Sequence, residues 1–88
     1  MDIDKKQELL ADINPNILTV DGHDNALIGY VEVFNKAIAV YDKDLVIKNL
    51  EKDMTYEEAL EYFDFNIKGA YMGETTPAFL TTFNSLEK

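Results

Sequence analysis

The sequence predicts a small α+β domain of residues 1–88, in which three helices pack against an antiparallel sheet. A run rich in Val, Ile, Tyr and Phe at residues 26–34 has the composition of a strand. Apolar residues at helical spacing follow Thr55, and shorter stretches of this kind occupy residues 5–12 and 43–52. With 88 residues, 47% of them hydrophobic, the chain has room for one modest core.

The first helix is expected over residues 5–12. Asp4 is its predicted N-cap and Gln7 the capping-box partner, with Leu9, Leu10 and Ile13 facing inward. The helix ends at Asn14-Pro15-Asn16 because proline lacks an amide donor and asparagine favours turns.

A hairpin is expected next, beginning with the strand at residues 26–34. Alternation puts Leu27, Val31 and Val33 on one face and Ile28, Tyr30 and Phe34 on the other. Apolar side chains on both faces predict a central strand that is covered on two sides. Asn35-Lys36 is the expected turn to a second strand at residues 37–41.

The second half of the chain is predicted to hold two helices and a short strand. Asp42 or Asp44 caps a helix over residues 43–52, with Val46, Ile47 and Leu50 inward. A capping box of Thr55 and Glu58 opens the longest helix, which runs to about Met72, where Gly73 supplies a left-handed cap. A strand over residues 78–83 and a flexible polar tail at about 84–88 complete the domain.

Three stripes follow from placing residues 56–71 on a helical wheel. The core stripe contains Tyr56, Ala59, Leu60, Phe63, Ile67, Ala70 and Tyr71. An acidic stripe contains Glu57, Glu61 and Asp64, with Lys68 one step further. It is a solvated face, an edge that meets a basic partner, or a set of carboxylates that binds a cation.

The third stripe contains Glu58, Tyr62, Phe65 and Gly69, roughly 150° from the core stripe. A helix with one buried face does not need Phe65 there, and glycine inside a helix costs about 1 kcal/mol unless a close backbone approach compensates. The stripe is either covered by another part of this chain, the N-terminal helix or the C-terminal segment, or it is a docking notch for a partner or a second copy.

The charge balance narrows the function. Seventeen Asp and Glu against eight Lys and no Arg give a net charge of −9, so direct nucleic-acid binding is not expected. A chain that imitates nucleic acid or docks on a basic protein fits the same charge. There is no cysteine, and His23, the single histidine, lies in a polar loop without a positioned nucleophile. We therefore predict no catalytic residues, no metal site and no cofactor.

The expected location is the cytoplasm. The start of the chain lacks the pattern of a secretory signal, and the longest apolar run, residues 26–31, is far shorter than the roughly 18 residues of a membrane span. Neither secretion nor a membrane partner is therefore expected.

Four stretches resemble a family of small acidic proteins encoded by bacteriophages and prophages. They are ALIGYVEVF (26–34), AVYD (39–42), MTYEEALEYFDFN (54–66) and GAYMGETTPAF (69–79). The likeness covers about residues 20–80. The family carries no established activity, so the resemblance implies only a context, a phage-derived protein that acts inside the bacterial host cell.

The leading hypothesis is a non-enzymatic protein-binding module that acts on a host or defence protein. Its binding residues would be Glu57, Glu58, Glu61, Tyr62, Asp64, Phe65 and Gly69. The alternative is a homodimeric structural or accessory phage protein with no inhibitory role, in which the stripe of Tyr62, Phe65 and Gly69 pairs with itself.

Overall fold

The computed structural model describes residues 2–20, 22–69, 73 and 75–86. It confirms the α+β class, with a hairpin, a short C-terminal strand and three helices of seven or more residues in the predicted order. The predicted core residues Ala70 and Tyr71, the predicted helix end Met72, and Glu74 lie outside the described residues.

Helix α1 (Ile3–Ile13) begins two residues earlier than predicted. The carboxylate of Asp2 accepts the backbone N–H of Lys5 at 2.9 Å, so Asp2 is the N-cap and Asp4 lies in the first turn. Leu10 is buried, but Leu9 and Ile13 are exposed, which corrects their assignment to the core. Only part of the helix's apolar stripe therefore reaches the rest of the domain.

Strand β1 (Leu27–Val33) follows a short 3₁₀ turn, η1 (Asp24–Ala26), and pairs antiparallel with β2 (Lys36–Asp42). Val33 pairs with Lys36, so the turn residues are Phe34 and Asn35, one position before the prediction. Phe34 has φ 55°, the positive angle that tight hairpin turns require at their first central residue. It is 96% exposed at the hairpin tip.

A β-bulge interrupts the start of β1. Leu27 lies opposite Tyr41 and Gly29 lies opposite Val40, so Ile28 is an extra residue. The bulge changes the predicted faces, because Leu27 now shares a face with Tyr30, which lies opposite Ala39.

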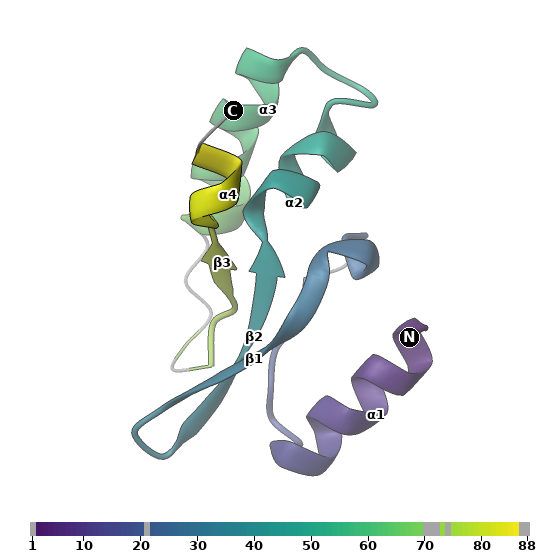
Figure 1. Ribbon diagram of the computed structural model, residues 1–88, viewed down its shortest axis with the longest axis vertical. Coiled ribbons are helices and arrows are strands. Elements are labelled where there is room, and N and C mark those ends of the chain that lie inside the picture. Colours follow the sequence, from purple (N-terminus) through teal and green to yellow (C-terminus); the bar gives the residue numbers. More distant parts are fainter. Residues whose placement is uncertain (1, 21, 70–72, 74, 87–88) are drawn as a thin grey trace.

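The sheet has the order β1-β2-β3, with β1 at an edge. Strand β3 (Ala78–Leu80) pairs parallel with the end of β2, so the sheet is mixed (Figure 1). The prediction that β1 is a central strand is therefore wrong. Of its seven residues only Leu27 is buried, since β2 occupies the centre and α1 covers part of one face.

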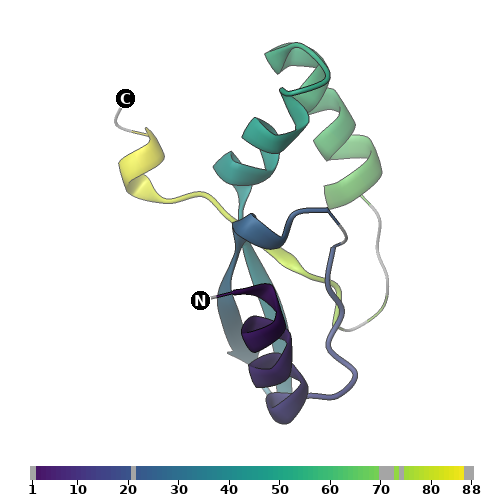
Figure 2. The same cartoon turned by 90° about the vertical axis from the view of Figure 1, so that its right-hand side faces the viewer.

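Helices α2 (Lys43–Leu50) and α3 (Tyr56–Tyr62) pack together at the end of the sheet away from α1, as Figures 1 and 2 both show. Asp42 caps α2 by accepting the backbone N–H groups of Asp44 and Leu45, at 3.0 and 3.4 Å. Asp44 therefore lies inside the helix.

After Tyr62 the helix widens into a π-helical segment, η2 (Phe63–Lys68). The last element of the described residues is the one-turn helix α4 (Phe83–Leu86), so residues 84–86, predicted as part of a flexible tail, are helical.

The core lies where the sheet meets these helices. Tyr41, Val46 and Phe63 are the largest fully buried side chains. The ring of Phe79, on β3, packs against the rings of Phe63 and Tyr41, at centroid distances of 5.0 and 5.9 Å. Tyr56, predicted in the core stripe, is exposed, because it is the first residue of α3 and stands a turn before the buried Ala59.

Candidate functional site

The predicted binding residues all come from α3, η2 and the residue that follows them, and all are exposed. We call them the acidic–aromatic surface, made of Glu57, Glu58, Glu61, Tyr62, Asp64, Phe65 and Gly69. The side chains of this surface flank the buried residues Ala59 and Phe63, which attach it to the core.

Thr55 and Glu58 fix the start of this surface. The Thr55 hydroxyl accepts the Glu58 backbone N–H at 3.2 Å, and the Glu58 carboxylate accepts the Thr55 backbone N–H at 3.0 Å. These hydrogen bonds from the backbone and side chain of Thr55 lower the pKa of Glu58. The capping box is confirmed, and Glu58 is thereby held against the helix end, whereas Glu57 and Glu61 have no such restraint.

Phe65 is the most exposed aromatic residue of the surface, with 80% of its area accessible, and Tyr62 is 44% accessible. Phe63 is fully buried whereas Phe65, two residues later, projects outward, as the helical wheel predicted. Both residues belong to η2, whose π-helical hydrogen bonds close over five residues. Single π-helical turns of this kind occur frequently at functional sites.

The chain's own backbone explains why residue 69 is a glycine. A Cβ atom at this position would lie 2.9 Å from the carbonyl oxygen of Asp64 and 3.3 Å from that of Phe65. The close approach that compensates for glycine is therefore made by the chain's own backbone at the end of η2. The glycine at this position therefore does not by itself indicate a docking notch.

Neither segment proposed to cover the aromatic stripe does so within the described part of the chain. Helix α1 lies beside β1 at the other end of the molecule (Figure 2). Helix α4 borders a hollow lined by Tyr56 and Leu60 of α3 together with residues of α2, and Phe65 is not among its lining residues. The stripe of Tyr62 and Phe65 is accordingly available to another molecule.

His23 is buried rather than a free loop residue. The Asn49 side-chain amide donates to Nδ1 of His23 at 3.2 Å, and because an amide nitrogen only donates, the ring nitrogen is the acceptor. Asn49 also exchanges two hydrogen bonds with Asn25, of 2.7 and 3.2 Å. Burial lowers the pKa of His23, although the charge of Asp24 opposes the shift. These contacts join the loop before β1 to the end of α2.

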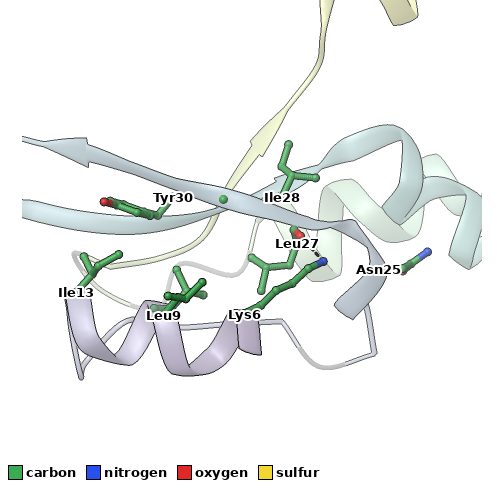
Figure 3. A pocket seen from close by; sticks show the side chains of 9 residues that line it. Lys6, Leu9, Ile13, Asn25, Leu27, Ile28 and Tyr30 are labelled. Atoms are coloured by element: carbon green, nitrogen blue, oxygen red, sulfur yellow. Dashed lines mark hydrogen bonds between the residues drawn. The ribbon is translucent and has the colours of Figure 1, made fainter. Parts of the chain in front are cut away.

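A groove between α1 and β1 is the feature that the sequence did not reveal as a site. Its volume is about 550 Å³ and its walls are mostly apolar, from Leu9, Leu10, Ile13, Leu27, Ile28 and Tyr30 (Figure 3). Lys6 is the charged residue of its lining, and its ammonium donates to the Leu27 carbonyl oxygen at 2.7 Å. The sequence signal for this groove was β1 itself, whose two apolar faces are unusual for an edge strand.

Among the residues that the structure describes, no three His, Asp or Glu side chains gather as they would around a metal ion. Within the same residues, no helix combines the length and apolar character needed to cross a membrane.

Comparison of the chain with protein-family models, with curated proteins and with solved structures gives no match. The resemblance to small phage proteins therefore stays an expectation from the sequence.

Proposed function

We propose that this chain is a non-enzymatic protein-binding module, and that it binds a basic host or defence protein in a bacterial cell through the acidic–aromatic surface. The observation that carries the proposal is Phe65, an aromatic side chain on a helix that is anchored in the core, with 80% of its area accessible. The resemblance to small phage proteins supplies the cellular context.

Tyr62 and Phe65 would supply the binding energy. Aromatic residues are enriched among interface hot spots, where a few well-packed side chains account for most of the affinity. Two features suit these residues to the role. The capping box fixes the start of α3, and the burial of Ala59 and Phe63 fixes its core side. A surface ordered in advance loses less conformational entropy on binding.

Glu57, Glu61 and Asp64 would direct the encounter. They are exposed around the aromatic residues, in a chain whose net charge is −9. Complementary charge raises the association rate and discriminates between partners more than it raises affinity, and salt screens the effect. The partner of such a surface carries Lys and Arg around an apolar pocket.

The same charges disfavour the alternative that this stripe pairs with itself. A symmetric contact through Phe65 would bring Glu61 and Asp64 of two copies close together, and like charges at close range oppose association. The same carboxylates attract a basic partner but repel a second copy of this chain.

The test compares capture from a bacterial lysate by three immobilised proteins: the wild type, Phe65→Asp and Phe83→Asp. Phe83 is the matched control, because it is 86% exposed on α4 and receives the same change in charge. We expect a protein that wild type and Phe83→Asp retain at low salt, that high salt releases, and that Phe65→Asp does not retain. Equal retention by all three, or no retained protein at either salt, would contradict the proposal.

A further inference from the structure

Strand β1 has the side chains of a central strand in an edge position. Tyr30 and Val31 point to opposite faces, yet each is 41% exposed, and Val33 and Ile28 are exposed further. Natural edge strands are usually protected by lysine, proline or a covering segment. Between residues 29 and 33 this edge carries one charged residue, Glu32, and no lysine or proline.

The first residues of the β1 edge are not available for pairing with another strand. The Ile28 bulge interrupts the ladder there, and the Lys6 ammonium donates to the carbonyl oxygens of Asp24 and Leu27, at 3.2 and 2.7 Å. Residues 29–33 pair with β2 in continuous register, one residue for one. An added strand would therefore pair with this second part of β1.

The exposed apolar area around β1 is large for a chain of this size. Six side chains leave between 41% and 51% of their surface accessible, namely Leu9, Ile13, Ile28, Tyr30, Val31 and Val33. At roughly 180 Å² for a large side chain this is about 450 Å², more than half of the roughly 800 Å² that each partner buries in a standard interface. The main chain of the strand adds to it.

We propose that β1 pairs antiparallel with β1 of a second copy about Val31, so that two three-stranded sheets join into one continuous sheet. An incoming strand must present apolar side chains on both faces, because it meets Tyr30 and the α1 groove on one side and Val31 and Val33 on the other. Within the described chain, β1 is the exposed strand with this pattern, so a second copy of β1 is the occupant that fits it.

Pairing about Val31 is the register that these residues favour. It sets Val31 opposite Val31, Tyr30 opposite Glu32 and Gly29 opposite Val33, so the two Glu32 carboxylates do not face each other. In this register the Leu27 carbonyl oxygen keeps its hydrogen bond from the Lys6 ammonium. The two-fold axis is perpendicular to the sheet, so both α1 helices lie on the same face beside the seam, where Leu9 and Ile13 gain cover.

The salt dependence separates this contact from the proposed partner surface. Two copies of charge −9 repel each other, so screening strengthens the dimer, whereas it weakens the binding of a basic partner. Substitutions separate them as well, because Phe65 lies on η2, which continues α3 in the half of the molecule away from α1 and the hairpin tip (Figure 1).

Sedimentation of the wild type, Val31→Lys and Phe65→Asp at low and high salt tests the dimer. We expect a wild-type dimer at micromolar concentration that high salt tightens, weakened about tenfold or more by Val31→Lys and unchanged by Phe65→Asp. A wild type that stays monomeric, which would leave the groove to a foreign strand, overturns the proposal. So does a dimer that Phe65→Asp dissociates.

Single cysteines test the register and do not depend on how Val31→Lys folds. The chain has no cysteine of its own, so Val31→Cys places two thiols on the axis, at the roughly 5 Å Cα separation that a disulfide spans. The two copies of Val33→Cys would be more than about 13 Å apart. We expect a disulfide-linked dimer from Val31→Cys alone on mild oxidation. Equal linking of both variants, or of Val33→Cys alone, contradicts the register.

Discussion

The hydroxyl oxygen of Tyr41 accepts the backbone N–H of Val20 at 2.7 Å. Tyr41 is 1% exposed in the core, whereas Val20 lies in the long connection between α1 and β1. This hydrogen bond ties an irregular segment to the central strand. A segment without a ladder of its own depends on such side-chain partners to satisfy its backbone groups.

Removing this acceptor gives the first prediction. Tyr41→Phe keeps the ring that packs on Phe79 but leaves the Val20 N–H without the hydroxyl, so we expect a loss of about 1–2 kcal/mol in unfolding free energy. Urea unfolding measures it. The exposed Tyr56 is the matched control, and Tyr56→Phe should change stability by less than about 0.5 kcal/mol. Equal effects of the two substitutions would count against the anchoring role.

The capping box gives the second prediction. Thr55→Ala removes the oxygen that accepts the Glu58 N–H, so we expect the protein to lose about 1 kcal/mol of stability. Thr55→Ser retains a hydroxyl and should stay near the wild type. Urea unfolding of both variants decides the matter, and a Thr55→Ser variant as unstable as Thr55→Ala would show that the hydroxyl is not what matters.

The third prediction concerns pH and His23. Burial lowers the pKa of His23 below 6.5, so the unfolded chain takes up a proton at higher pH than the folded one. The stability that neutral His23 provides is complete above pH 6.5 and is lost as the pH falls from 6.5 through the folded-state pKa. Glu58, whose pKa is lowered from 4.5, acts only at lower pH.

His23→Gln removes the titrating group and keeps an acceptor for Asn49. We expect the variant to be less stable than the wild type above pH 6.5, and its stability to fall less steeply below that pH. Urea unfolding across this range makes the comparison. Parallel stability curves for the two proteins would exclude His23 as the source of the slope.

The fourth prediction uses two glycines. Gly69→Ala would bring a Cβ atom to 2.9 Å from the Asp64 carbonyl oxygen, so we expect it to destabilise the protein by about 1–3 kcal/mol. In an ordinary helix interior the same change stabilises by about 1 kcal/mol. Gly29→Ala has no atom within 4 Å of the new carbon and serves as the control. A stabilising Gly69→Ala, measured by thermal unfolding, would contradict the assigned packing.

Local features of this fold could be predicted from the sequence. The capping box of Thr55 and Glu58, the Asp42 cap and the order of the elements depend on residues a few positions apart, and they formed as expected. The acidic residues of α3 and η2 are exposed, as are Tyr62 and Phe65. The sequence could establish their spacing but not their accessibility, which depends on where α1 and α4 dock.

The other features of the fold depend on contacts between residues that are far apart in the sequence. Two apolar faces indicate a central strand, but β1 is an edge because β3 joins the far side of β2. The bulge at Ile28 then shifted Leu27 onto the face of Tyr30, which alternation alone does not reveal. The π-helical segment was not predicted, although Phe63 and Phe65 lie inward and outward as the helical wheel placed them, and the close approach at Gly69 is made by the carbonyl groups of Asp64 and Phe65.

The most direct test of the account is the affinity of Phe65→Asp for the protein that the wild type captures. Titration calorimetry with that protein should show binding at least about 30-fold weaker than for the wild type, the loss typical of a hot-spot residue, with Phe83→Asp unchanged. Wild-type affinity for Phe65→Asp would contradict the claim that this surface is where the protein acts.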